Sequence, residues 1–218
     1  MFLRARASAM LSGGRRRLRA VVFDLDGTLT APGAIDFARL RSRLGMPARH
    51  PDILQWCHSQ PPHERPSLLR IVAEEEEAGL DNLQLNAGAE PLFSFLAART
   101  PRLFSGVLTR NNEDVMRRSL AKLDLLGGRH AFDVLVSRDF EGAPKPSPDG
   151  LLHMARGWRI DASEIVMVGD APDDMQAALA AGAVAVAIGD DDEAGQLAHH
   201  RVRTLCQLVP LLEEIGVE

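Results

Sequence analysis

The chain has 218 residues, of which 45% are hydrophobic and 25% charged, and these fractions are ordinary for a soluble globular protein. Two cysteines, Cys57 and Cys206, have no metal or redox spacing, and no apolar run approaches the ~20 residues of a membrane-spanning helix. Six of the 25 basic residues are arginines within the first 20 positions, so the remainder carries 19 basic against 30 acidic side chains. Because that acidic body would repel phosphates, a general nucleic-acid surface is excluded.

Residues 1–19 form a basic N-terminal tail that is rich in arginine, contains serine and alanine, and has no acid. This composition suits an organellar transit peptide as well as a solvated, disordered start. The expected location is therefore the cytoplasm, with the mitochondrion or plastid as the alternative.

The first strand-like run is AVVFDL at 20–25, and it leads directly into two acids, Asp24 and Asp26. Between it and the next such run, residues 33–87 contain no strand-like segment. Three helices are expected there, separated by prolines, at 35–45, 51–60 and 65–80. Within the last of these, Glu74–Glu77 is expected to be a solvated helix face. We therefore predict a small inserted helical cap at 33–87.

Apolar runs and helical segments alternate through the rest of the chain. The expected strands are 103–108, 132–136, 164–169 and 183–188. They are too short for helices and do not alternate cleanly, which is typical of strands buried on both faces of a parallel sheet. Helices are expected at 88–99, 112–125, 147–158 and 173–182, and a last one near the C-terminus, after a polar loop at 190–192 and a turn near His199 and His200. The fold class is therefore α/β, a doubly wound, mostly parallel, Rossmann-like sheet, with the core at 20–32 and 88–218.

Polar residues follow four of these strands or lie in the loops beyond them, namely Asp24, Asp26, Thr109, Lys145 and Asp170. In open α/β sheets, ligands bind outside the carboxyl ends of the strands. Close carboxylates repel one another, and a hard cation such as Mg²⁺, which prefers oxygen ligands, removes that conflict. The hydroxyl and the ammonium group can then donate to phosphate oxygens.

Asp24 and Asp26 are one residue apart, and at strand spacing their side chains point the same way. One carboxylate can attack phosphorus as a nucleophile. The other can protonate the leaving oxygen and later deprotonate a water. The pair therefore suits a two-step phosphoryl transfer.

Four segments resemble, in order, the four signatures of the haloacid dehalogenase-like (HAD) superfamily. They are FDLDGTLT at 23–30, LTRNN at 108–112, KPSPDG at 145–150 and VGDAPDD at 168–174. The resemblance covers residues 20 to about 190, and its pattern is similar to the phosphoglycolate phosphatase-like branch, which has a helical cap after the first signature.

This resemblance implies that Asp24 is the nucleophile and Asp26 the general acid and base. It also implies that Asp24, the main-chain carbonyl of Asp26, and Asp170 hold Mg²⁺. Because true dehalogenases lack the second acid of the first signature, Asp26 favours phosphoryl transfer over halide displacement.

The resemblance further implies that Thr109 and Lys145 hold the phosphate, and that Asp174 acts through a water or by orienting Lys145. Two positions depart from the family pattern. Ala171 replaces a usual serine, and Arg110 adds a cation beside the phosphate site that could bind a second anionic group.

The expected function is a Mg²⁺-dependent phosphatase that hydrolyses a small phosphorylated metabolite through an aspartyl-phosphate, without a nucleic-acid or membrane partner. Three alternatives stay open from the motifs: a phosphomutase of the same fold, a protein phosphatase, and a non-catalytic phospho-accepting regulatory module.

Overall fold

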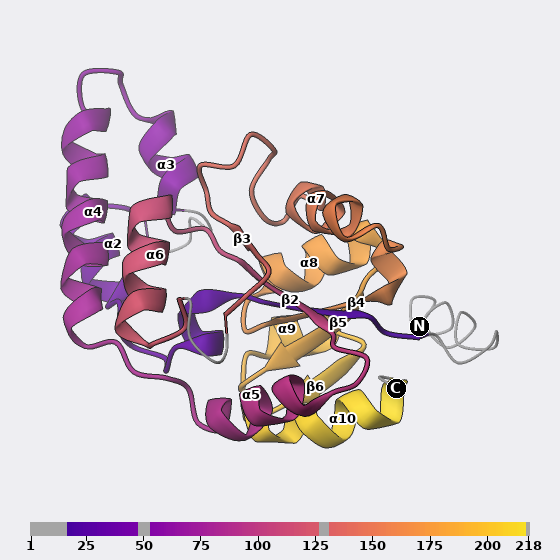
Figure 1. The fold of residues 1–218 in the computed structure, drawn as a ribbon. Helices are drawn as coiled ribbons and strands as arrows, with labels where there is room; N and C mark the ends of the chain where they lie inside the picture. Colours follow the sequence, from indigo (N-terminus) through magenta and orange to yellow (C-terminus); the bar gives the residue numbers. More distant parts are fainter. Residues whose placement is uncertain (1–16, 48–52, 127–130, 217–218) are drawn as a thin grey trace.

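The computed structural model describes residues 17–47, 53–126 and 131–216, and the predicted basic tail lies almost entirely outside them. Within this part of the chain, six parallel strands form one sheet in the order β3-β2-β1-β4-β5-β6. The strands are β1 (Ala20–Phe23), β2 (Phe104–Leu108), β3 (Val134–Val136), β4 (Ile165–Gly169), β5 (Val184–Ile188) and β6 (His200–Val202). The predicted α/β class with a parallel sheet is confirmed (Figure 1).

Apolar runs predicted as strands contain β1 to β5, because each strand is buried between two helix layers. In β1, Val21 and Phe23 join one hydrophobic cluster, whereas Ala20 and Val22 join the other. The first cluster includes residues of α5 (Ala89–Ala98), α6 (Glu113–Lys122) and α10 (Leu208–Ile215). The second includes residues of α7 (Asp149–Trp158), α8 (Pro172–Ala181) and α9 (Asp192–Leu197). Both faces of each strand are thus apolar, which removes the alternation of a half-buried strand.

Near the C-terminus the prediction was wrong in part. Asp190 and Asp191 lie in the predicted polar loop, but the short helix α9 begins at Asp192, and β6 begins at His200, where a turn was expected. Ala187 of β5 pairs with Arg201 of β6. The Asp191 side chain caps α9 by accepting from the Ala194 amide at 2.7 Å. Three residues that include His and Arg carry no strand signal of their own, so β6 depends on its pairing with β5.

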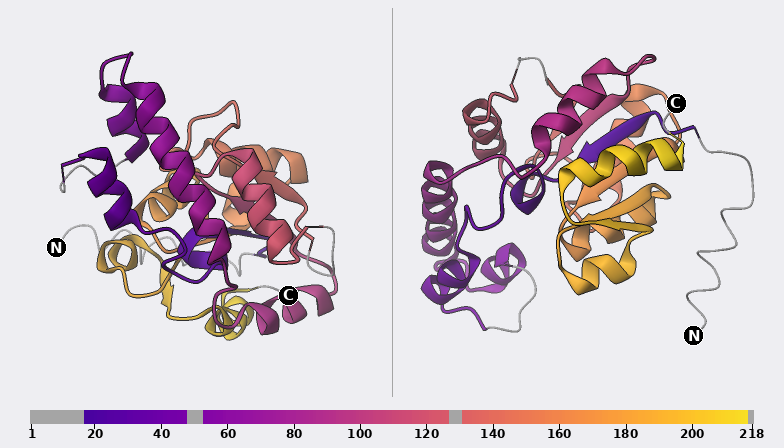
Figure 2. Two further views of the ribbon diagram at one scale, coloured as in Figure 1. Left: turned by 90° about the vertical axis from the view of Figure 1, so that its left-hand side faces the viewer. Right: turned by 90° about the horizontal axis from the view of Figure 1, so that it is seen from below.

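Three helices lie between β1 and β2, namely α2 (Phe37–Leu44), α3 (Ile53–Ser59) and α4 (Arg65–Asp81). They stand to one side of the sheet (Figure 2) and share a hydrophobic cluster that includes Leu40, Cys57 and Val72. The two connections to the core run side by side, since Thr30 and Leu85 form an antiparallel bridge. The three predicted helices are present, and the division of the chain into core and cap stays a prediction.

The prediction that Glu74–Glu77 is a solvated helix face was wrong for the two central residues. Glu75 and Glu76 are only 3% and 7% exposed. Glu75 Oε1 accepts from Arg39 Nε at 3.0 Å and from Arg43 Nη1 at 2.8 Å, so two arginines of α2 neutralise it. Glu76 instead faces the core, and Glu77 binds Arg118 of α6. No helix in the described ranges is long and apolar enough to cross a membrane.

Removing a leucine from the buried layer should destabilise the fold far more than removing one from its surface. Leu92 of α5 is fully buried, whereas Leu152 of α7 is 36% exposed. We expect Leu92→Ala to lower the free energy of unfolding by about 2–5 kcal/mol, because it deletes packing and leaves a cavity. Leu152→Ala should change it by less than about 0.5 kcal/mol. Urea denaturation of the two variants measures the difference, and equal losses would contradict the assignment of this core.

Candidate active site

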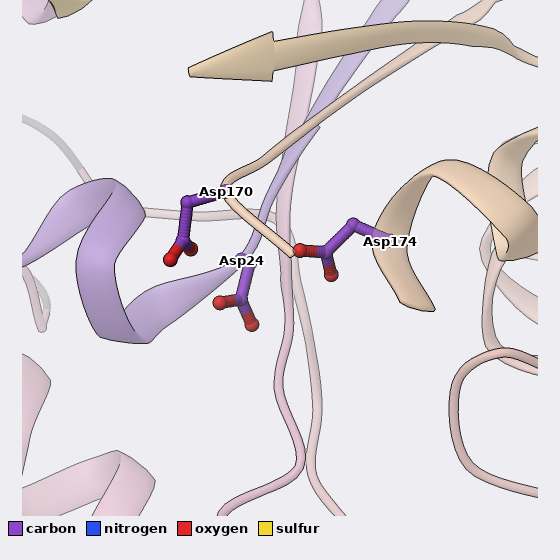
Figure 3. Close-up of side chains that lie close together, drawn as sticks. All are labelled: Asp24, Asp170 and Asp174. Atoms are coloured by element: carbon purple, nitrogen blue, oxygen red, sulfur yellow. The ribbon is translucent and has the colours of Figure 1, made fainter. Parts of the chain in front are cut away.

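Three carboxyl groups converge at the carboxyl edge of the two central strands (Figure 3). Asp24 follows β1, and its amide donates to Val168 of β4 at 2.9 Å. Asp170 follows β4, and Asp174 lies in the first turn of α8. Within the described residues, one oxygen from each of the three lies within 4.8 Å of the others. Because β1 and β4 are neighbours, residues 146 positions apart meet here.

Two glycines make room for these carboxyl groups. A Cβ on Gly169 would lie 2.3 Å from the Asp174 carboxyl carbon, and a Cβ on Gly27 would lie 2.3 Å from Asp170 Oδ2. Gly27 also has φ of 77°, and with Asp26 (φ −79°, ψ 126°) it forms the centre of a type II turn. A side chain at either position would therefore displace a carboxylate of the cluster.

Lys145 supplies the counter-charge for two of the acids. Its Nζ lies 2.5 Å from Asp24 Oδ1 and 2.5 Å from Asp174 Oδ1, and its side chain is 4% exposed. Burial lowers the pKa of Lys145, but the Asp174 and Asp24 carboxylates raise it by more, so the amine stays protonated. The second Asp174 oxygen accepts from the Ala171 amide at 3.0 Å. Asp174 thus contacts Lys145 directly.

The remaining charge of the cluster is negative. Three carboxylates and one ammonium group leave a formal charge of −2, and burial is the main cause that raises the pKa of Asp24 well above its ordinary value. Burial likewise raises the pKa of Asp170 to about 6, with the nearby Asp174 charge adding to the effect. An all-oxygen donor set with this charge fits a hard divalent cation such as Mg²⁺.

Asp26 lies outside this cluster. The strand ends at Phe23, so Asp26 belongs to the turn and not to the strand spacing that the sequence suggested. Its Oδ2 accepts from Asn111 Nδ2 at 2.7 Å. Burial raises the pKa of Asp26 although the Asn111 hydrogen bond opposes it. A carboxyl with a raised pKa is suited to carry a proton to a leaving group.

The loop after β2 brings the second predicted segment to the site. Thr109 is buried, and its Oγ1 accepts from the Asn111 amide at 3.1 Å. Asn111, which the sequence analysis gave only as part of the second motif segment, therefore links Thr109 to Asp26. Asn112 caps α6 by accepting from the Val115 amide at 2.9 Å.

Arg110 contacts the fourth predicted segment. Its Nη1 lies 2.6 Å from Asp173 Oδ2, in the first turn of α8 beside Asp174. The cation that was expected to bind a second anionic group of the substrate is thus paired with a carboxylate. Substrate binding by Arg110 stays a prediction.

Two supporting residues escaped the sequence analysis. Thr28 Oγ1 donates to Asp170 Oδ1 at 2.9 Å. Asn86 Nδ2 donates to the carbonyls of Gly27 at 3.2 Å and Thr28 at 2.9 Å, and it comes from the far end of the helical insert. These contacts hold the turn against Asp170. Their partners are 142 and about 60 positions away, so no local pattern marks them.

The raised pKa of Asp170 predicts a stability change with pH in metal-free protein. A carboxyl whose pKa is raised on folding, here from 3.8 to about 6, favours the folded state below the lower value. That contribution is lost as pH rises through about 6. An asparagine at this position cannot ionise, and it can still accept from Thr28. We therefore expect the free energy of unfolding of Asp170→Asn to exceed that of the wild type by about 1–3 kcal/mol near pH 8.

Urea denaturation with EDTA measures this gain, which should fade near pH 4. Asp114→Asn is the control, because the Asp114 side chain is 76% exposed on α6. A gain of equal size at both pH values would show that the pKa of Asp170 is not raised on folding.

Comparisons with known proteins agree with this geometry. The family model described as haloacid dehalogenase-like hydrolase matches residues 18–182. A haloacid dehalogenase-like hydrolase domain-containing protein of Arabidopsis thaliana is 35% identical over 80% of this chain and 72% of its own length. A phosphoglycolate phosphatase of Chromobacterium violaceum is 31% identical over 80% of this chain and 86% of its own. The crystal structure of a predicted phosphoglycolate phosphatase from Haemophilus somnus has the same fold, with a TM-score of 0.70, 17% identity, and coverage of 91% of this chain and 99% of that one. The chain therefore belongs to the haloacid dehalogenase-like hydrolases.

Proposed function

We propose that this protein is a Mg²⁺-dependent phosphatase that hydrolyses a small phosphomonoester through an aspartyl-phosphate on Asp24. The observation that carries the proposal is the cluster of the buried Asp24, Asp174 and Lys145 with the half-buried Asp170, beside Asp26 on the adjoining turn. The resemblance to phosphoglycolate phosphatases supports the substrate class. The helical insert at 33–87 would then be a cap over this edge of the sheet.

Two steps follow from the positions of the acids. In the first, a carboxylate oxygen of Asp24 attacks phosphorus, the bond from phosphorus to the ester oxygen breaks, and Asp26 gives that oxygen its proton. In the second, Asp26 takes a proton from water, whose oxygen attacks phosphorus. Inorganic phosphate leaves, and the Asp24 carboxylate is restored. Asp26 returns to its protonated form, so the protons balance over the cycle.

The oxygen atoms of Asp24 and Asp170, with the main-chain carbonyl of Asp26, would hold Mg²⁺. The ion would neutralise the carboxylates and attract the phosphate oxygens. Lys145 orients Asp24 and opposes the rise in its pKa that burial causes, since it is already hydrogen-bonded to that carboxylate and to Asp174. Thr109 and Lys145 would donate to the phosphate oxygens. Arg110, which is held by Asp173, would add positive potential at the margin of the phosphate site.

Substitution of the two acids should separate their roles. With Mg²⁺ and p-nitrophenyl phosphate, we expect Asp24→Asn to lower kcat by at least about 10³-fold, because the amide is a poor nucleophile. We expect Asp26→Asn to lower kcat by about 10²–10⁴-fold for an alkyl phosphate, and by less for p-nitrophenyl phosphate. The p-nitrophenolate ion leaves without a proton, so it needs the acid least.

Phosphate release and circular dichroism test these expectations, with Asp114→Asn as a control on the surface of α6. EDTA should abolish turnover, and added Mg²⁺ should restore it. A folded Asp24→Asn variant that keeps most of its activity would refute the proposal.

A further inference from the structure

A cavity of about 220 Å³ lies between the helical insert and the core. Its apolar walls come from α3 and α4, and they are Leu54, Leu69, Val72 and Ala73. Four polar side chains complete the lining. Asn112 and Arg138 come from the loops after β2 and β3, Glu76 comes from α4, and His58 comes from α3, where its Nδ1 lies 2.8 Å from the Leu54 carbonyl oxygen. It is smaller than the 300–1,000 Å³ of most ligand pockets, so its occupant is a small group.

The cavity adjoins the proton-carrying side of the candidate site. Asn112 lies next to Asn111, whose side chain donates to Asp26 at 2.7 Å. Glu76 Oε2 accepts from Asn112 Nδ2 at 3.3 Å. Burial raises the pKa of Glu76 against the opposing Arg138 charge, and the charge of Asp26 raises it further, which places the two carboxyls within electrostatic reach. A phosphomonoester whose bridging oxygen faces Asp26 would therefore direct its carbon part toward this cavity.

The charged groups of the cavity already have partners. Arg138 Nη1 lies 3.4 Å from Glu76 Oε1, and Glu76 is only 7% exposed. A second anionic group on the substrate would meet the Glu76 carboxylate beside the arginine. A sugar-like group would place several hydroxyls against four apolar side chains, where each unpaired hydroxyl is unfavourable. An apolar carbon group meets neither obstacle.

We propose that this cavity binds the leaving group and selects small phosphomonoesters with an apolar leaving group over those with a polyhydroxylated or second anionic one. The proposal rests on the proposed phosphatase function, because the orientation of the ester depends on Asp26 as the acid. It departs from the chemistry of the phosphoglycolate phosphatase relative, whose named substrate carries a carboxylate.

Three substrates of similar size test the selection. n-Propyl phosphate and glycerol 3-phosphate share a three-carbon skeleton and differ by two hydroxyls, and 2-phosphoglycolate adds a carboxylate. We expect kcat/KM for n-propyl phosphate to exceed that for each of the others by at least about tenfold. Equal or reversed values would overturn the proposal.

Acetyl phosphate separates this failure from failure of the phosphatase function. Its acetate leaving group departs without a proton, so its hydrolysis depends least on how the leaving group is held against Asp26. Suppose that the protein hydrolyses acetyl phosphate and that Asp24→Asn abolishes this hydrolysis. If n-propyl phosphate is then not preferred, the proposed selection alone is overturned. Absence of hydrolysis of all four compounds with Mg²⁺ would overturn both proposals.

A matched pair of variants on α4 locates the effect. Ala73 is exposed and lines the cavity, whereas Ala78 is exposed on the same helix and does not line it. We expect Ala73→Leu to lower the ratio of kcat/KM for n-propyl phosphate to that for acetyl phosphate by at least about fivefold, since it narrows the cavity. Ala78→Leu should leave that ratio at the wild-type value. An unchanged ratio in Ala73→Leu, or an equal fall in both variants, would contradict the assignment of the cavity.

Discussion

Electrostatic repulsion among three carboxylates, held within 4.8 Å of one another, is the constraint on which the rest of this structure depends. Such a group would rather take up protons than ionise together, and burial strengthens that tendency. Lys145 opposes it by bonding to Asp24 and Asp174 at once. One ammonium group cannot balance three acids, so the edge of the sheet keeps a negative charge that suits a divalent cation. The net negative charge of the three carboxylates is unfavourable for folding, but the same charge makes this edge of the sheet suited to bind a cation and, with it, a phosphate.

The architecture supplies what the cluster requires. Placing β1 beside β4 brings Asp24 next to Asp170, and the absence of a side chain at Gly27 and Gly169 lets the neighbouring carboxyls approach the backbone closely. The acids project from a sheet whose two faces are buried in hydrophobic clusters. The burial of this apolar surface contributes enough folding free energy to offset the cost of desolvating the charged groups. A rigid support is also what a phosphoryl transfer needs, since the attacking oxygen and the proton donor must be held in register.

The parts of the structure that the sequence predicted are those with a local signal. Continuous apolar runs predicted β1 to β5, and Asp24, Asp170, Asp174 and Lys145, which the motifs singled out, do meet in space. What the sequence missed depends on partners far along the chain. β6 is a strand because it pairs with β5, and Glu75 is buried because two arginines of α2 neutralise it. Asn86 holds the turn at Gly27 and Thr28 from a position about 60 residues away, and a charge run or a lone asparagine carries no sign of such contacts.

Helix α4 links the helical insert to the core, because its successive residues have different partners. Glu75 is bonded to α2, Glu76 faces the cavity and Arg138, and Glu77 holds Arg118 of α6. Lys122 of α6 donates to the Leu80 carbonyl at 2.5 Å, which fixes the end of the same helix to the core. The α4 wall of the cavity is therefore anchored to α6, the helix that begins just after Asn111 and Asn112. Asn111 holds Asp26, so under the proposed mechanism a group that fits against α4 would also be presented to the acid that protonates it, and a group that fits poorly would lose alignment with that proton.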